Sequence, residues 1–123
     1  MKKLILITLL IFSSTSYAEW TEVGEADGYI FYLDFERIRK HDGYVYYWMM
    51  TDYPKPNEYG FLSAQNYKRG DCNLFRFNNL QFVFYTGNMG GGLSDSQEAI
   101  EKRWHYPPPG TANEVMLKLA CSG

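Results

Sequence analysis

The sequence predicts an α+β domain, in which an antiparallel sheet of about six strands carries a C-terminal helix on one face, tied to the sheet by a disulfide. Three observations support this fold class. Turn-forming residues recur between runs rich in Tyr, Phe, Val and Trp, a pattern typical of an antiparallel meander. A wide apolar stripe with helical spacing occurs near the C-terminus. The two cysteines, Cys72 and Cys121, follow an N-terminal export signal, and exported domains commonly form disulfides.

Residues 1–18 have the pattern of a secretory signal peptide. Two lysines precede an apolar run, Leu4 to Phe12, and small residues follow it up to Ala18. The run is too short to span a membrane. The alternative to a cleaved signal peptide is a signal anchor that stays attached to the domain. We therefore expect cleavage after Ala18 and an exported domain over residues 19–123. Its expected location is the periplasm, the cell surface or the medium.

Length and composition limit the class of protein. The chain has 123 residues, of which 46% are hydrophobic and 18% aromatic, which is enough for one globular domain and excludes a disordered tail. The net charge is −2, and it becomes −4 when Lys2 and Lys3 leave with the signal peptide. Because nucleic-acid binding needs a basic surface, we expect no nucleic-acid partner.

Glycine- and proline-containing turns set the bounds of the expected strands. The strongest strand is residues 44–52, which is apolar or aromatic on both faces and so belongs in the middle of a sheet with both sides covered. Asp34 is expected to cap a single helical turn that precedes this strand. The six expected strands are residues 20–23, 29–33, 44–52, 59–67, 72–77 and 80–86.

The pattern changes after Gly92. Residues 94–103 contain helix formers and a capping pair, Ser94 with Gln97, which indicates a short surface helix or an irregular loop. Thr111 and Glu114 then form a capping box before an apolar stripe, which predicts a helix of about three turns.

That C-terminal helix is expected to cover one face of the sheet. Its predicted stripe places Ala112, Val115 and Leu119 on one side, with Met116 and Ala120 beside them. The other apolar face remains open to three interpretations: closure by curvature of the sheet, cover by the segment 89–104, or burial in a dimer.

Cys72 and Cys121 are expected to form a structural disulfide that pins the end of the helix to a strand. The alternatives are a metal pair and a catalytic thiol. A metal site needs clustered ligands, and the only histidines are His41 and His105.

The sequence contains no established catalytic motif, so we expect a non-enzymatic protein. It lacks a G-x-S-x-G elbow, a phosphate-loop lysine and an H-E-x-x-H pair. The glycines after Met89 are expected to form a sharp turn or bulge. His105, between Trp104 and Tyr106, and His41 are candidate haem ligands, with an ordinary loop or turn histidine as the alternative for each. No other cofactor or metal is expected.

One segment offers a candidate partner-binding patch. Tyr67, Lys68, Arg69 and Arg76 bring local positive charge, which would favour an acidic protein partner. The alternative is an ordinary solvated face, since acidic residues lie nearby in the sequence. The tyrosines have two interpretations as well, core volume or an adhesive surface, and we favour the core for most of them. The candidates for an adhesive surface are Tyr44, Tyr46, Tyr53, Tyr59 and Tyr67.

The order of these motifs resembles the surface-adhesin protein E family of Gram-negative bacteria over essentially the whole exported chain. The matching series begins with Tyr29-Ile30-Phe31-Tyr32-Leu33-Asp34 and Ile38, continues through the Gly43 turn, Thr51-Asp52-Tyr53-Pro54-Lys55-Pro56, Ser63 to Tyr67 and Asp71-Cys72, and ends with Phe84-Tyr85, Gly90 to Gly92, Trp104, Glu114 and Cys121. The resemblance implies a six-stranded antiparallel sheet, a C-terminal helix held by the disulfide, and a homodimer. It also implies an adhesin that binds matrix and plasma proteins such as vitronectin and laminin, with haem binding suggested. By similarity, the binding region would be residues 57–77.

Two departures from the family pattern bear on function. The family's adhesin is a lipoprotein, whereas no cysteine for lipid attachment stands directly after the apolar run of the signal sequence here. The corresponding stretch of the adhesin is richly basic, whereas this chain has Glu58 and Asp71 among its few basic residues. We expect an exported, non-enzymatic binding module for a protein partner such as an extracellular matrix protein. The alternatives are a periplasmic structural or envelope domain and a small-ligand carrier for haem.

Overall fold

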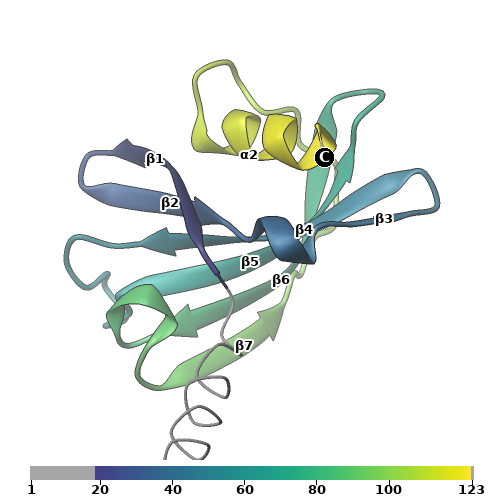
Figure 1. The fold of residues 1–123 in the computed structure, drawn as a ribbon. Helices are drawn as coiled ribbons and strands as arrows, with labels where there is room; N and C mark the ends of the chain where they lie inside the picture. Colours follow the sequence, from purple (N-terminus) through teal and green to yellow (C-terminus); the bar gives the residue numbers. More distant parts are fainter. Residues whose placement is uncertain (1–18, 123) are drawn as a thin grey trace, which may run out of the picture.

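In the computed structural model, which describes residues 19–122, one antiparallel sheet carries one α-helix on one side (Figure 1). The predicted signal peptide lies outside the described residues. The strands are hydrogen-bonded in the order β1-β2-β4-β5-β6-β7, and β3 pairs with β4. The elements are β1 (Thr21–Ala26), β2 (Tyr29–Leu33), η1 (Phe35–Arg37), β3 (Arg39–His41), β4 (Tyr44–Asp52), β5 (Ser63–Asp71), β6 (Arg76–Tyr85), η2 (Asn88–Gly90), β7 (Ser94–Glu98) and α2 (Ala112–Cys121). The predicted fold class is confirmed.

β2 and β3 pair with different parts of the same strand, β4. β2 pairs with residues 49–52 and β3 with residues 44–46, and the single turn η1 lies between them in the chain. Asp34 caps η1 as predicted, because its Oδ1 accepts a hydrogen bond from the Glu36 N–H at 3.2 Å. The sequence does not predict β3, because its three residues are polar and exposed and lack an apolar alternation.

The bounds of β4 are those predicted, but the expected strand over residues 59–67 is wrong in its first half. Asn57 organises a turn there: its Oδ1 accepts hydrogen bonds from the N–H groups of Tyr59 and Phe61, both at 3.0 Å. Gly60 within this turn has a φ of 83°, which glycine adopts without strain. β5 therefore begins only at Ser63 and continues to Asp71.

The expected strand over residues 72–77 is also wrong, because most of it forms the turn between β5 and β6. Asp71 Oδ1 accepts hydrogen bonds from the N–H groups of Asn73 at 3.1 Å and Leu74 at 3.2 Å. Phe75 has a φ of 51° and completes the reversal. β6 then runs unbroken from Arg76 to Tyr85 and includes most of the strand expected over residues 80–86.

The helix or loop expected over residues 94–103 is a strand in its first half. β7 pairs with β6, for example Gln97 with Phe82 and Asp95 with Phe84. All five residues of β7 are exposed, so their side chains carry no apolar signature. A short helix without a buried face is marginal, and backbone pairing with the open edge of β6 is favoured over it. Ser94 is consequently not a helix cap.

α2 forms where predicted, with its buried stripe shifted by one position. Thr111 is the N-cap, and its Oγ1 accepts a hydrogen bond from the Glu114 N–H at 3.3 Å. The Glu114 carboxylate accepts from the Gly110 N–H at 2.9 Å. The buried residues are Met116, Leu117 and Ala120, whereas Val115 is 37% exposed.

The core lies between α2 and one side of the sheet, which we call the inner face; the opposite side is the outer face. Gly70 of β5 is required for this packing. A Cβ atom there would lie 2.6 Å from Leu117 Cδ1 and 2.9 Å from Val45 Cγ1, so glycine permits the close approach of helix and sheet. The buried core residues are Leu33, Val45, Tyr47, Met49, Met116, Leu117 and Ala120.

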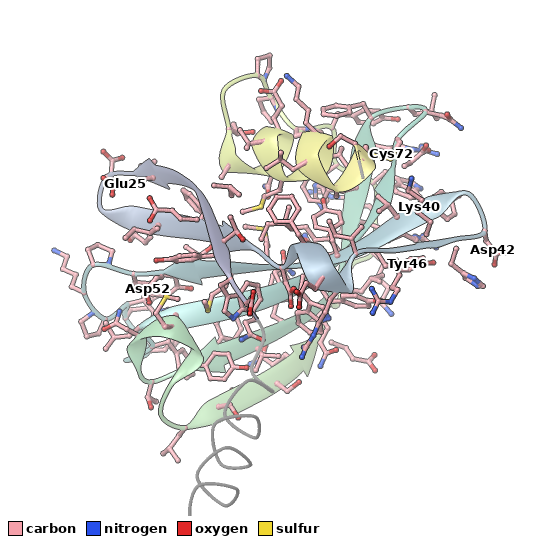
Figure 2. The ribbon with its side chains drawn as sticks, viewed as in Figure 1. Glu25, Lys40, Asp42, Tyr46, Asp52 and Cys72 are labelled. Atoms are coloured by element: carbon pink, nitrogen blue, oxygen red, sulfur yellow. A yellow bond between two sulfur atoms is a disulfide. The ribbon has the colours of Figure 1, made fainter. Side chains whose placement is uncertain are left out.

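The disulfide between Cys72 and Cys121 is confirmed, with a Cα–Cα distance of 5.8 Å. It joins the end of α2 to the turn that follows β5, and Figure 2 shows Cys72 beside that end of the helix. The disulfide therefore holds the helix against the inner face. Among residues 19–122, no helix is both long and apolar enough to cross a membrane.

Candidate functional site

The outer face carries partly exposed aromatic side chains from β4 and β5. Side chains alternate along a strand, so Tyr46 and Trp48 lie on the side of β4 opposite the core residue Tyr47. The Tyr67 ring of β5 stacks on Trp48 at a centroid distance of 4.8 Å and lies 6.1 Å from the Tyr46 ring. We call Tyr46, Trp48 and Tyr67 the aromatic strip. It presents flat, rigid contact area in the middle of the outer face.

Next to the strip, two arginines lie against a tryptophan from a distant segment. Backbone hydrogen bonds of 2.9 Å and 2.7 Å join Phe77 and His105, and this pairing brings the preceding Trp104 over the sheet. The Arg69 guanidinium lies 4.8 Å from the Tyr44 ring and 5.0 Å from the Trp104 ring, and the Arg76 guanidinium lies 4.3 Å from Trp104. We call Tyr44, Arg69, Arg76 and Trp104 the arginine stack.

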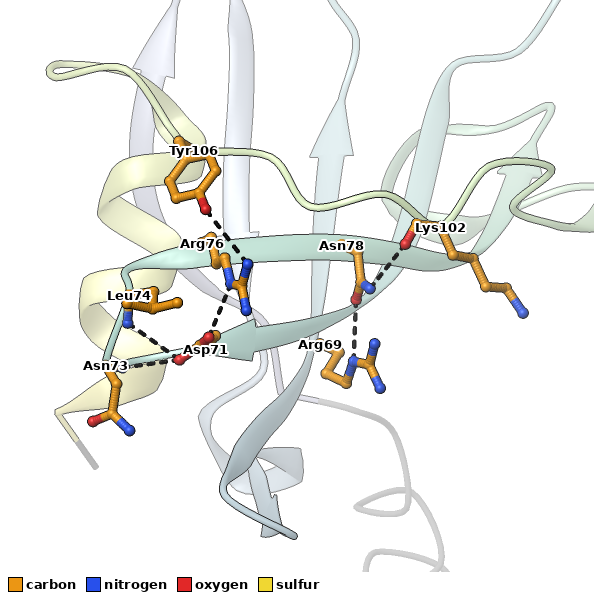
Figure 3. A network of polar contacts seen from close by, with 8 residues as sticks. All are labelled: Arg69, Asp71, Asn73, Leu74, Arg76, Asn78, Lys102 and Tyr106. Atoms are coloured by element: carbon orange, nitrogen blue, oxygen red, sulfur yellow. Dashed lines mark hydrogen bonds and ion pairs between the residues drawn. The ribbon is translucent and has the colours of Figure 1, made fainter.

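Asp71 fixes one arginine of this stack (Figure 3). Arg76 Nε donates to Asp71 Oδ2 at 2.9 Å, and Arg76 Nη1 donates to the Tyr106 hydroxyl at 3.4 Å. Burial alone would raise the pKa of Asp71, but the hydrogen bonds from Leu74, Arg76 and Asn73 and the charge of Arg76 lower it overall. Asp71 therefore stays ionised, and its charge is matched by Arg76.

Arg69 is held by neutral groups instead. Its Nε donates to Asn78 Oδ1 at 3.3 Å, and Asn78 Nδ2 donates to the Lys102 carbonyl at 3.1 Å (Figure 3). None of the ion pairs between residues 19–122 involves Arg69. The guanidinium is thus fixed in place by two rings and an amide, and its charge has no carboxylate partner in the described chain.

The other end of the outer face is covered by η2. The Gly90 N–H donates to Ser63 Oγ at 2.9 Å, and the Met89 N–H donates to Asp52 Oδ1 at 2.8 Å. The glycine-rich segment forms the sharp turn that was predicted, closed by a hydrogen bond of 2.9 Å from the Gly87 N–H to the Gly91 carbonyl. The segment 89–104 therefore covers the outer face at its two ends and leaves the aromatic strip between them.

The structure brings three of the four predicted partner-binding residues, Tyr67, Arg69 and Arg76, onto the outer face. Lys68 lies on the inner face, because adjacent residues of a strand point to opposite sides. It is 3% exposed, and its Nζ donates to Asn79 Oδ1 at 2.7 Å and lies 4.1 Å above the Phe77 ring. Burial lowers the pKa of Lys68 to about 7.

Sequence reasoning missed Trp48 and Trp104 at this face. The alternation of aromatic residues in β4 contains the signal for Trp48, which shares a face with Tyr44 and Tyr46. Trp104 has no local signal, because the pairing of His105 with Phe77 that places it joins distant segments.

The pKa of Tyr67 shows which charge lies near the aromatic strip. Burial raises this pKa, Tyr46 raises it further, and Arg39 lowers it, so the charge of Arg39 also reaches the outer face.

The two candidate haem ligands lie in different settings. His41 precedes the turn between β3 and β4, and its Nε2 lies 3.1 Å from Asp42 Oδ2. The His105 ring stacks on Phe77 at 5.4 Å. No group of three or more His, Cys, Asp or Glu side chains that could hold a metal ion occurs in the described part of the chain.

Comparison with known protein families gives one match over most of the chain. The model of the family described as surface-adhesin protein E matches residues 20–122. No curated protein matches this sequence.

Solved structures of Haemophilus influenzae protein E share the fold. Crystal form II of that protein aligns with a TM-score of 0.64 and 18% identity, covering 83% of this chain and 96% of the other. A second structure of protein E aligns with a TM-score of 0.60 and 18% identity, covering 84% and 93%. Protein E from non-typeable Haemophilus influenzae aligns with a TM-score of 0.55 and 20% identity, covering 86% of each chain.

Proposed function

The chain belongs to the surface-adhesin protein E family, and we propose that it is an exported, non-enzymatic binding module that holds an acidic segment of a protein partner on its outer face. The observation that carries this proposal is that the charge of Arg69 has no carboxylate partner among the described residues. Its guanidinium lies against two aromatic rings that also contact each other, and no ion pair among the described residues includes it. A partner carboxylate would supply the missing opposite charge.

The surroundings of Arg69 suit a contact surface. Tyr, Trp and Arg are the residue types enriched where protein interfaces gain most of their binding energy. The rings of the arginine stack already fix the guanidinium, so less side-chain entropy is lost when a partner binds. The adjacent aromatic strip adds apolar area beside the charge. Together they favour a partner that presents carboxylates next to apolar side chains.

The family resemblance suggests which partners to test first. It implies extracellular matrix and plasma proteins, with vitronectin and laminin as the candidates. We propose that one of these contacts the arginine stack through an acidic stretch. Electrostatic attraction of this kind acts mainly on the association rate and weakens as salt is added.

The test is binding of the exported domain to immobilised vitronectin and laminin at low and at physiological salt. Arg69→Glu should reduce the association rate and flatten its dependence on salt. Lys55→Glu makes the same change of charge at an exposed position between β4 and β5 and should leave binding unchanged. The proposal is overturned if the wild type binds neither protein at low salt, or if both variants bind equally well.

A location experiment tests whether such partners are accessible. Protease added to intact cells should cleave the protein if it lies on the cell surface. Protection until the outer membrane is opened would place it in the periplasm and would contradict a role in matrix binding. Sedimentation of the wild type and of a Trp48→Ser variant would show whether the aromatic strip is instead occupied by a second copy of the chain, the homodimer that the resemblance implies.

A further inference from the structure

The inner face has a groove that the helix does not fill. It has a volume of about 400 Å³ and lies between the sheet and the start of α2. This volume falls in the range of small-ligand sites. The larger apolar side chains of its lining are Phe31 of β2, Met49 of β4, and Phe82 and Phe84 of β6.

The charged residue of the groove lining is Lys68, and the lining contains no Asp or Glu. Lys68 is 3% exposed, and its hydrogen-bond partner is the neutral side chain of Asn79. An ammonium group has three N–H donors, so Asn79 leaves donors of Lys68 unused. Burial of a charge without an opposite charge is unfavourable, and it lowers the pKa of Lys68 to about 7. An anion in the groove would remove this cost.

The start of α2 contributes positive potential to the same groove. Thr111, Ala112 and Asn113 line it, and the N–H groups of Ala112 and Asn113 belong to the first turn of the helix, where no acceptor exists within the helix. The positive end of the helix dipole favours an anion at this position, although the Glu114 carboxylate, bonded to the Gly110 N–H, offsets part of that potential. The buried lysine and the helix start therefore favour the same charge in a ligand, from two separate elements.

We propose that this groove binds a small amphiphilic carboxylate, with its carboxylate against Lys68 and the start of α2 and its apolar part along Phe82 and Phe84. The apolar lining argues against a free inorganic anion, and the single buried cation matches one carboxylate. This site lies on the opposite side of the sheet from the arginine stack. Its ligand class goes beyond the protein contacts proposed for the outer face and does not depend on them.

The experiment compares decanoate with 1-decanol, which share an alkyl chain and differ in charge. Each is titrated into the exported domain by calorimetry at pH 6.5. The wild type should bind decanoate about tenfold or more tightly than decanol, because a charged hydrogen bond contributes to the first and not to the second. Lys68→Met should lose this preference and keep its affinity for decanol. Lys118→Met, at an exposed position of α2 outside the groove, should behave as the wild type.

A measurement on the wild type alone keeps the proposal testable if Lys68→Met does not fold. Decanoate added to labelled protein should shift the amide resonances of Ala112 and Asn113 and the side-chain signal of Lys68. Shifts confined to the outer face would overturn the proposal and indicate detergent-like adsorption on the aromatic strip. Equal affinity of the wild type for decanoate and decanol, or no binding of decanoate, would also overturn it. None of these results would affect the proposal for Arg69.

Discussion

Tyr46 and Tyr47 are neighbours in β4, yet they lie on opposite faces of the sheet and in different surroundings. Tyr47 is fully buried beneath α2, whereas Tyr46 is partly exposed beside Tyr67. Burial raises the pKa of Tyr47, and its hydroxyl has no hydrogen-bond partner. The same residue type therefore contributes core volume on the inner face and contact area on the outer face.

The neighbouring cations of β5 repeat this contrast. Arg69 lies on the outer face against two rings, while Lys68 is buried on the inner face beside Asn79 and Phe77. A guanidinium is weakly hydrated and stacks well on aromatic rings. A buried ammonium is strongly disfavoured in its charged form, and its pKa falls. Burial on the inner face thus makes the charge of Lys68 dependent on pH near neutrality.

The largest expected difference between the faces is in stability. Tyr47→Ala removes a fully buried ring and should lower the free energy of unfolding by about 3–5 kcal/mol. Tyr46→Ala removes a partly exposed ring and should cost about 1 kcal/mol or less. Urea titration of both variants measures the two values. Equal losses would contradict the assignment of the two faces.

The disulfide holds α2 against the inner face, so its removal should weaken that face selectively. The paired change Cys72→Ser and Cys121→Ser opens a loop with a sequence separation of 49 residues, and chain entropy predicts a loss of about 4 kcal/mol. Urea titration measures the loss, and wild type unfolded in excess reductant should show a similar one. Binding through Arg69 should persist in the fraction that remains folded. A loss below about 1 kcal/mol would show that packing alone holds the helix.

The third prediction concerns pH. The pKa of Lys68 is about 7 in the folded chain against an ordinary value of 10.5. Between these values the unfolded chain binds more protons, so the free energy of unfolding should rise with pH. The rise from pH 7 to pH 9 should be about 2–3 kcal/mol, since one pKa unit corresponds to about 1.4 kcal/mol. Urea titrations at several pH values measure it.

Two variants separate this effect from other titrations. Lys68→Met should be more stable than the wild type at pH 7 and should lose the rise. Lys118→Met should keep it. Above about pH 10 the raised pKa of Tyr47 reverses the trend, because the unfolded tyrosine ionises first. Parallel curves for the wild type and Lys68→Met would contradict a depressed pKa.

The fold features that the sequence predicts are those with strong local patterns. β4 is apolar or aromatic along most of its length, and its predicted bounds are those observed. Thr111 and Glu114 mark the start of α2, and the two cysteines pair as expected. β3 and β7 are missed because their residues are polar and exposed, and their pairing depends on a partner strand that no local window contains.

The residues of the candidate site also divide into those with a local sequence signal and those placed by distant segments. Tyr67, Arg69 and Arg76 could be proposed from local charge and aromatic content, and the structure places all three on one face. Proximity in the sequence alone groups Lys68 with them, although strand alternation separates it from its neighbours. Trp104 could not be found, because the backbone pairing of His105 with Phe77 brings it to Arg69.

The smallest expected effect is the coupling that holds Arg69 in place. A double-mutant cycle of Arg69→Ala and Trp104→Ala, measured by urea titration, should give a coupling energy of about 0.5–1 kcal/mol, as for a partly exposed cation–π contact. Arg103→Ala with Trp104→Ala is the matched control. Arg103 pairs with Glu101 and makes no ring contact with Trp104, so its coupling should be near zero. Equal couplings in the two cycles would mean that Trp104 does not fix the guanidinium, and the preorganisation argued for the outer face would then be lost.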